Sequence, residues 1–363
     1  SAPEFTVHRG RRGSTAARFL RPALGRPNLS VEVGALTTRV ILQQGRAVGI
    51  EYEQGGVQHV AQATREVILS GGAFNSPQLL LLSGIGPGEE LRDNGIEVHC
   101  DLPGVGRNLQ DHASVASLYE ASGPFTFDNQ LRADRMARSI MRWQLFGTGP
   151  LAGLPVGAQG FIKTRPGLDR PDLQQLVSPV AMDAKVWFPG WRKGRGHYFS
   201  VANVLLHPES RGWVRLASPD PRAKPRIQFN LLSTAGDRAS FRRFQRNLRT
   251  FFATEPARSM VSAELVPGPA VQSDDEIDAY VRRGVGTAMH PTSTCAMGTG
   301  TDAVLDAQLR VRGVDGLRVV DASSMPLIVG GNTNAPVIMI AEKAADMILG
   351  KPAPAAADYA RAA

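Results

Sequence analysis

The chain has 363 residues, 42% of them hydrophobic and 20% charged, which is enough to bury a sizeable core in one large or two medium domains. Its net charge of +8 includes a basic run near the N-terminus, but few aromatic residues lie among those arginines, so nucleic-acid binding is not expected. No apolar run reaches the length of a membrane span, and residues 1–20 are more typical of a domain interior than of a signal peptide.

The two cysteines, Cys100 and Cys295, are far apart in the sequence and predict neither a disulfide framework nor a CxxC metal site. They are compatible with a reducing compartment, and we expect a cytoplasmic protein. The seven histidines form no HxxxH pattern and no carboxylate cluster accompanies them, so the sequence predicts no metal site.

Residues 28–70 are typical of a small antiparallel β-meander, because short β-rich runs alternate with turn pairs such as Gly55-Gly56. The run EVILS at its end is apolar on both faces and predicts a buried parallel strand. In the following GGAFNSPQLLLLSGIG, we expect Ser76 to cap a helix whose first residue is Pro77. Such a strand, glycine pair and helix can approach a dinucleotide, but the same glycines are equally suited to a simple tight turn.

Residues 113–275 predict a mixed α and β insertion built on an antiparallel sheet. The stretch RADRMARSIMRWQLFG is typical of an amphipathic helix. The stretch HYFSVANVLLHPESRGWVRLAS predicts a pair of strands with a turn at Pro208–Gly212.

Residues 276–363 return to alternating strands and helices. DDEIDAYVRR predicts a capped helix, GLRVVDASSMP a buried strand, and NAPVIMIAEKAADMILGKP a further helix. We expect Asn334 to cap that last helix, with Pro336 in its first turn. The free N–H groups at this helix start are suited to an anion such as a reduced flavin.

The stretch TAMHPTSTCAMGTG contains His290 and Cys295. No cysteine-hydrolase motif surrounds Cys295, which is better interpreted as a small buried residue, and the chain has no GxSxG motif of a serine hydrolase. A redox or general-base role therefore remains for His290. Asp321, at the end of a predicted parallel strand, is suited either to a ribose or ribityl hydroxyl or to capping the next turn.

Several long motifs in this chain resemble those of the glucose–methanol–choline (GMC) oxidoreductases: SGGAFNSPQLLLLSGIGP, PGVGRNLQDH, HPESRGWVRLASPDPRAKPRIQFNLLS, MHPTSTCAMG and DGLRVVDASSMPLIVGGNTNAPVIMIAEKAADMI. The resemblance runs from Arg9 to Gly350 and is greatest to the choline-dehydrogenase-like branch. It implies a mixed α/β fold, with an FAD-binding Rossmann-like domain and a substrate domain of antiparallel sheet and helices. By this resemblance, residues 1–112 and 276–363 are the middle and C-terminal parts of the FAD-binding domain, and residues 113–275 are the substrate-binding domain.

The resemblance further implies FAD-dependent oxidation of a small-molecule alcohol to an aldehyde or ketone, with oxygen or a quinone-like compound as electron acceptor. His290 matches the base that takes the hydroxyl proton while hydride passes to flavin N5, and Asn334 matches the residue that hydrogen-bonds to the substrate oxygen. The positions that match the family's FAD contacts are Thr37, Ser70, Gly71, Gly72, Ser76, Asp321, Ala322, Asn334, Ala335 and Pro336.

The chain departs from the family pattern in lacking the N-terminal βαβ unit with its GxGxxG motif, since GIGPGE, GVGRNL and GVGTAM all fail at the third glycine. We therefore expect FAD binding to require an N-terminal segment or a separate chain that completes the site. Two alternatives stay open: an isolated non-catalytic fragment, and a lyase or decarboxylase with the same fold.

Overall fold

The computed structural model describes residues 5–153 and 155–352, and the chain divides into two compact units. Unit 1 comprises Ser1–Glu32, Ala113–Glu209 and Leu232–Ala288, and unit 2 comprises Val33–His112, Ser210–Leu231 and Met289–Ala363. The change of unit after residue 112 coincides with a predicted domain boundary. Residues 1–32 and 276–288, predicted to belong to the FAD-binding domain, group instead with residues 113–209 in unit 1. Residues 210–231, predicted to belong to the substrate domain, group with unit 2. The roles given to those ranges stay predictions.

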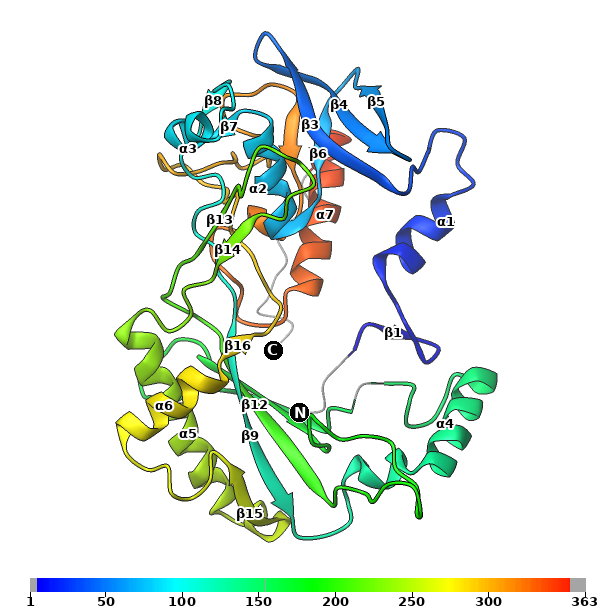
Figure 1. Ribbon diagram of the computed structural model, residues 1–363, viewed down its shortest axis with the longest axis vertical. Helices are drawn as coiled ribbons and strands as arrows, with labels where there is room; N and C mark the ends of the chain where they lie inside the picture. The colour runs from blue at the N-terminus through cyan, green and yellow to red at the C-terminus, as the bar shows by residue number, and fades with distance from the viewer. Residues whose placement is uncertain (1–4, 154, 353–363) are drawn as a thin grey trace. The chain divides into compact units, whose positions relative to one another are not determined.

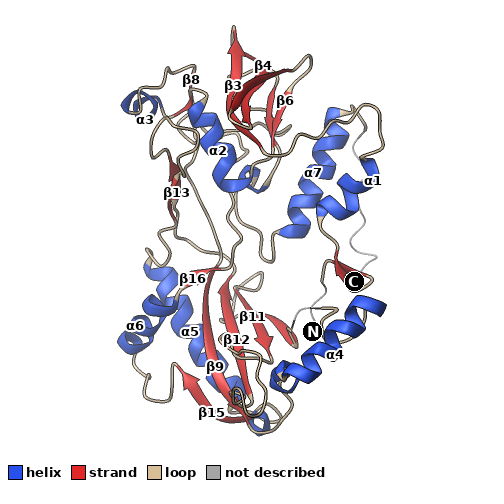
Figure 2. Cartoon of the chain, turned by 45° about the vertical axis from the view of Figure 1, so that its right-hand side comes forward, coloured by secondary structure: helices blue, strands red, loops and turns tan. Residues whose placement is uncertain are grey.

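Unit 1 is built on an antiparallel sheet with the strand order β10-β11-β12-β9-β15, and β16 also pairs with β9. The helix α5 (Ala235–Phe252) packs against this sheet, since its Leu248 lies in one buried cluster with Tyr119, Phe199 and Val201. Figure 2 shows α5 beside the central strands. The strands are β9 (Ala113–Ala121), β10 (Ala158–Ile162), β11 (Leu173–Ser178), β12 (Tyr198–Leu205), β15 (Val261–Val266) and β16 (Gly286–Thr287).

Two further helices of unit 1 follow the sequence prediction. The amphipathic helix is α4 (Ala133–Phe146), which ends at Gly147 in the left-handed conformation that glycine tolerates best. The capped helix is α6 (Asp274–Gly284), and it begins with a capping box in which Ser273 and Glu276 satisfy each other's backbone N–H groups.

Unit 2 contains the predicted meander, formed by β3 (Ala35–Gln43), β4 (Arg46–Gln54) and β5 (Val57–Gln62) in antiparallel pairing (Figure 1). Gly55 and Gly56 both have positive φ, at 59° and 82°. This is the backbone conformation of the tight turns that match the twist of a β-hairpin, and glycine adopts it without a steric penalty.

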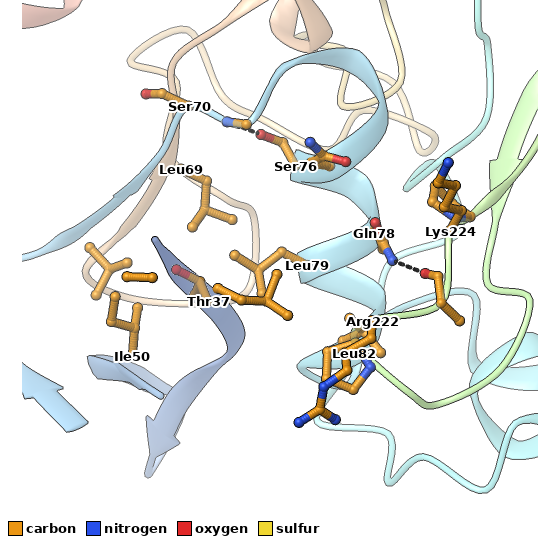
Figure 3. Close-up of a pocket in the computed structure, with 18 of the residues that line it drawn as sticks. Thr37, Ile50, Leu69, Ser70, Ser76, Gln78, Leu79, Leu82, Arg222 and Lys224 are labelled. Atoms are coloured by element: carbon orange, nitrogen blue, oxygen red, sulfur yellow. Dashed lines mark hydrogen bonds between the residues drawn. The ribbon is translucent and has the colours of Figure 1, made fainter. Parts of the chain in front are cut away.

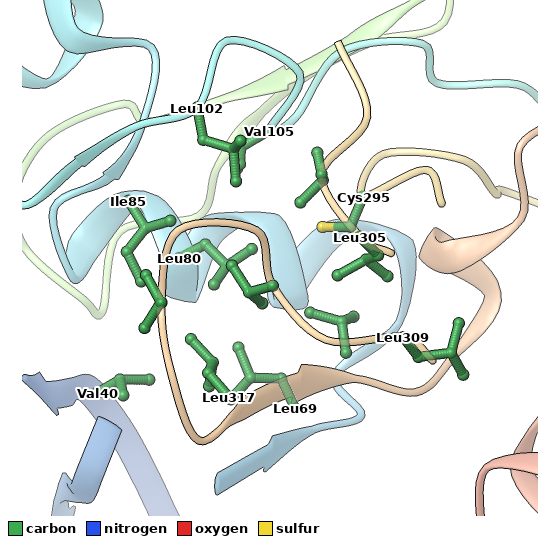
Figure 4. Packing of buried hydrophobic residues seen from close by; sticks show 14 of the residues in the cluster. Val40, Leu69, Leu80, Ile85, Leu102, Val105, Cys295, Leu305, Leu309 and Leu317 are labelled. Atoms are coloured by element: carbon green, nitrogen blue, oxygen red, sulfur yellow. The ribbon is translucent and has the colours of Figure 1, made fainter. Parts of the chain in front are cut away.

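The strand β6 (Val67–Leu69) pairs in parallel with β17 (Leu317–Val319), as predicted, but it is buried on one face only: Val67 and Leu69 are buried, whereas Ile68 is 44% exposed. The main hydrophobic cluster of unit 2 surrounds this pair (Figure 4), and it includes Leu69, Leu80, Ile85, Val105, Cys295, Leu305 and Leu317. Cys295 is fully buried there, so its interpretation as a small core residue is confirmed.

The helix after β6, α2 (Gly72–Leu82), begins before the predicted position, and Pro77 lies inside it. The expected cap was wrong because the Ser76 hydroxyl has other partners: it accepts from the Gly71 N–H at 2.9 Å and donates to Asp321 at 2.6 Å. Pro77 has no N–H to donate to the carbonyl of Ala73. That carbonyl instead accepts a 2.6 Å hydrogen bond from the Thr294 hydroxyl, which offsets the loss.

The strand pair predicted around Pro208–Gly212 does not form. β12 pairs with β9 and β11, whereas β13 (Trp213–Arg215) pairs with β14 (Arg226–Gln228) in a separate two-stranded sheet. The change from unit 1 to unit 2 falls between residues 209 and 210, inside the expected turn, so the two strands belong to different units.

The last described helix is α7 (Asn334–Ile348), which follows the short turn η4 (Ala322–Ser324). Asn334 is its first residue rather than its cap; the cap position is occupied by Thr333, whose side chain makes no capping hydrogen bond. Among the described helices, none is both long and apolar enough to cross a membrane.

Candidate functional site

His290 lies in a loop of unit 2 that is held against the segment ending at His112. The backbones of Gln110 and Thr292 exchange hydrogen bonds of 3.2 and 2.9 Å. This pairing brings the two imidazoles together, with their Nδ1 atoms 3.0 Å apart and their planes at 86°. A ring nitrogen can donate in one tautomer and accept in the other, so the short distance requires one ring to donate to the other.

Three backbone or side-chain groups fix the two rings from outside the pair. The Nε2 atom of His112 is 3.0 Å from the carbonyl oxygen of Val329, and the Nε2 atom of His290 is 3.2 Å from the amide nitrogen of Asn332. The backbone N–H of His290 donates to the Asp111 carboxylate at 3.0 Å. His290 is thus held by contacts at both ring nitrogens and at its backbone N–H.

Burial lowers the pKa of His290 below the ordinary histidine value, because the charged imidazolium loses solvation. The ring is therefore neutral at neutral pH and can accept a proton. Burial also raises the pKa of Asp111 to about 6, although backbone N–H groups of His290 and His112 oppose the shift. The Oδ2 atom of Asp111 is buried and has no hydrogen-bond partner among the described residues.

Of the two predicted catalytic residues, His290 is in this cluster, and the exposed Asn334 starts helix α7. Sequence reasoning missed Asp111, His112 and Asn332. Two of these end the motif PGVGRNLQDH, and the third lies in GGNTNAP, so the motifs contained the residues without indicating which side chains face His290.

A cavity of about 580 Å³ lies in unit 2 between β3, the end of β6, helix α2 and residues 221–225 (Figure 3). Four of the predicted cofactor residues line it: Thr37, Ser70, Gly71 and Ser76. Ile50, Leu69, Leu79 and Leu82 add apolar surface on the strand and helix sides. Polar and charged side chains also line the cavity: Asn75, Gln78, Arg222 and Lys224. The cavity therefore combines an apolar wall with hydroxyl and backbone groups, as sites for nucleotide-type ligands do.

The carboxylate of Asp321 has only 6% of its surface exposed and ties the end of β17 to the start of α2. Its Oδ2 accepts from the Gly72 N–H at 2.9 Å and from the Ser76 hydroxyl at 2.6 Å. Its Oδ1 accepts from the N–H and the hydroxyl of Ser323 at 2.8 and 2.5 Å. Both oxygens are thus used within the chain, and the turn-capping interpretation describes this geometry.

The remaining predicted cofactor residues lie at the starts of helices or in a turn, and they are half-buried or exposed. Gly72 has φ of 79°, and a Cβ atom there would meet nothing within 4 Å, so open space adjoins its backbone. Ala322 starts the turn η4 and its carbonyl accepts from the Ser293 N–H at 3.2 Å. Ala335 and Pro336 form the first turn of α7. Across residues 5–153 and 155–352, no group of three or more histidine, cysteine, aspartate or glutamate residues is placed to hold a metal ion.

These features define a mixed α/β protein in which a parallel strand pair, a glycine turn and a histidine cluster share one unit. Two family models described as GMC oxidoreductase match it, one over residues 3–114 and the other over residues 208–341. The chain belongs to the GMC oxidoreductase family, as its motifs predicted.

The chain is similar to curated and structurally characterised proteins over most of its length. It is 46% identical to the mitochondrial choline dehydrogenase of Mus musculus, covering 96% of this chain and 58% of that protein. It is 43% identical to the oxygen-dependent choline dehydrogenase of Brucella anthropi, covering 96% and 63%. Among solved structures, the formate oxidase of Aspergillus oryzae aligns with a TM-score of 0.86 at 27% identity, covering 95% of this chain and 64% of that one. The chain therefore spans about three fifths of the length of these relatives.

Proposed function

We propose that this chain carries the proton-accepting part of an FAD-dependent alcohol oxidoreductase, with His290 as the base. The observation that carries the proposal is the half-buried imidazole of His290: contacts at both ring nitrogens orient it, and burial lowers its pKa so that it is neutral at neutral pH. A positioned base of this kind typically contributes about 10²- to 10⁴-fold to the rate of proton removal. Membership of the GMC family supports the same chemistry.

The residues around the 580 Å³ cavity fit a flavin nucleotide. Thr37, Ser70, Gly71 and Ser76 would hold it there, with Ile50 and Leu79 against its apolar surfaces. When bound, FAD supplies the acceptor for the hydride that leaves the alcohol carbon. Asp321 positions the Gly72 amide and the Ser76 hydroxyl, so we assign it a supporting role in this cavity.

The chain's own groups at the reacting end have separate tasks. His290 would take the hydroxyl proton while the hydride leaves the alcohol carbon, so that no free alkoxide forms, and Asn334 is proposed to donate a hydrogen bond to the substrate oxygen. The first turn of α7, at Ala335 and Pro336, presents the positive end of a helix dipole, which favours negative charge on a neighbouring group.

The substrate is proposed to be a small-molecule alcohol. Choline is the first to test, because the choline dehydrogenases of Mus musculus and Brucella anthropi are 46% and 43% identical to this chain. The name of one of these relatives specifies oxygen dependence, so oxygen is one acceptor to test and a quinone-like compound is the other.

We further propose that stable FAD binding needs a segment carrying a glycine-rich phosphate loop. The 363 residues contain no GxGxxG motif, which normally brings backbone amides to the pyrophosphate, and the relatives are longer than this chain. The partner would be an N-terminal segment or a separate chain.

The test is to purify the chain in two ways: alone, and after co-expression with a choline dehydrogenase fragment that carries the GxGxxG segment absent from this chain. We expect visible flavin absorbance only in the co-expressed material, and bleaching of that absorbance by a primary alcohol under anaerobic conditions. His290→Ala should keep the flavin and slow bleaching by about 10²- to 10⁴-fold, whereas the exposed-site control His99→Gln should not.

Absence of flavin from both preparations would overturn the enzymatic proposal in favour of a non-catalytic fragment. Bound flavin that no alcohol in the panel bleaches would favour lyase or decarboxylase chemistry instead. Rapid bleaching in His290→Ala would remove His290 from the proposed role.

A further inference from the structure

We propose that His112 is a positioning residue that fixes the tautomer of His290, so that the Nε2 atom of His290 carries the lone pair that accepts the substrate proton. The inference rests on the proposed function for the role of that lone pair. The tautomer itself follows from the geometry of the two rings and their partners.

The first step concerns the proton on His112. Its Nε2 atom is 3.0 Å from the backbone carbonyl oxygen of Val329, and a carbonyl oxygen only accepts, so Nε2 of His112 must carry a proton. The side chain of His112 is fully buried, and a charged imidazolium would be costly there. His112 is therefore the neutral Nε2–H tautomer, and its Nδ1 atom is left as an acceptor.

The second step transfers this constraint to His290. Its Nδ1 atom is 3.0 Å from the Nδ1 acceptor of His112, so the proton between them belongs to His290. The neutral His290 ring then has no proton on Nε2. The amide nitrogen of Asn332, 3.2 Å from that atom, donates to it until a substrate hydroxyl takes its place.

The third step concerns the protonated state. When Nε2 of His290 gains the substrate proton, the ring becomes a cation and still donates its Nδ1–H to His112. A hydrogen bond from a charged donor is stronger than one between neutral rings, so the contact with His112 strengthens as the proton arrives. The Asp111 carboxylate, which accepts from the His290 backbone, is the acidic group next to His112 in the sequence. His112 thereby orients the neutral ring and stabilises the charged one.

The tautomer can be measured on the 363-residue chain without any cofactor. In ¹⁵N-histidine-labelled protein at about pH 8, where histidines are neutral, two-bond ¹H–¹⁵N spectra show which ring nitrogen is protonated. The His290 signals are identified by their loss in His290→Gln. We expect a protonated Nδ1 and an unprotonated Nε2 for His290, and the reverse for His112.

Two substitutions of His112 separate hydrogen bonding from packing. His112→Phe keeps a ring but removes the acceptor, and it should shift His290 to the Nε2–H form. His112→Gln offers an amide oxygen to His290 and an amide N–H to Val329, and it should keep the Nδ1–H form. Far-UV circular dichroism and the melting temperature report whether each variant folds, and the wild-type spectrum alone already decides the tautomer.

In flavin-loaded enzyme, His112→Phe should lower kcat by about 10- to 100-fold with KM changed less than about threefold, and His112→Gln should restore most of kcat. A wild-type His290 protonated on Nε2, or a tautomer unchanged by His112→Phe, would overturn the inference. The expected tautomer in a chain that never oxidises an alcohol would instead refute the proposed function and leave the assignment of His112 intact.

Discussion

Asp111 is a buried acidic side chain that holds the His290 backbone, and only 3% of its surface is exposed. One oxygen accepts the His290 N–H, while the other has no partner among the described residues. A buried carboxylate with one unsatisfied oxygen is stable mainly in its neutral form, which explains the raised pKa. The residue that holds the His290 backbone is thus itself sensitive to pH.

We predict that the free energy of unfolding of Asp111→Asn increases relative to that of wild type as the pH rises from about 4 to about 7. The folded-state pKa of Asp111, about 6, lies above the unfolded value near 4, so its contribution is fully present below about pH 4 and is lost as pH rises through about 6. A shift of about 2 units corresponds to about 3 kcal/mol, and asparagine does not titrate. Urea unfolding at several pH values between about 4 and 7 measures the difference.

The control for this measurement is Asp93→Asn, which changes an exposed carboxylate at the end of helix α3 (Gly88–Asp93). Its free energy of unfolding relative to wild type should vary far less across the same range. A constant difference between Asp111→Asn and wild type would contradict the prediction.

At the scale of elements, helices α6 and α7 begin in contrasting ways. Ser273 caps α6 through a capping box, whereas Thr333 occupies the cap position of α7 with helical backbone angles and no side-chain hydrogen bond. The first N–H groups of a helix lack partners within the helix, so a capping side chain satisfies groups that otherwise depend on water or a ligand. We propose that the uncapped start of α7, with its free N–H groups, faces the bound cofactor.

We predict that Ser273→Ala lowers the free energy of unfolding by about 1 kcal/mol, because the Glu276 N–H loses its acceptor. Thr333→Ala is the matched control, since it truncates a residue at a cap position where no capping hydrogen bond exists, and its cost should be smaller. Thermal and urea unfolding of both variants give the comparison. Equal losses for the two substitutions would show that the capping box does not stabilise α6.

At the scale of the molecule, each compact unit has its own hydrophobic cluster. The cluster of unit 2 is centred on helix α2 and the β6–β17 pair, and that of unit 1 joins the sheet to helix α5. Trp213 lies in unit 2, whereas the other three tryptophans lie in unit 1: Trp143, Trp187 and Trp191. Fluorescence can therefore report on one unit at a time.

In a variant whose sole tryptophan is Trp213, we predict that Leu80→Ala lowers the free energy of unfolding by about 2–5 kcal/mol. Leu80 is fully buried in the unit 2 cluster, and its truncation removes apolar contacts and leaves a cavity. Leu349→Ala, also in unit 2, is the control, because 65% of Leu349 is exposed and its loss should cost less than about 0.5 kcal/mol. A cost for Leu80→Ala no greater than that of the control would refute the packing argument.

Features that depend on near neighbours could be predicted from the sequence alone. The meander with its Gly55-Gly56 turn, the amphipathic helix α4 and the capped helix α6 follow from the spacing of apolar residues and from turn and cap chemistry within a few residues. The family followed from motifs of similarly local extent, while the catalytic role of His290, the cofactor contacts and the cytoplasmic location stay predictions.

Contacts between residues far apart in the sequence become visible only in the folded chain. His112 and His290 are 178 residues apart, and Ser76 and Asp321 are 245 apart. In our proposal, the first contact makes the tautomer of His290 depend on His112. The second contact engages the Ser76 hydroxyl, which the sequence predicts as a helix cap. Local patterns contain no information on such pairs, because these contacts are set by the packing of β6, β17 and α2 and by the pairing of the Gln110 and Thr292 backbones.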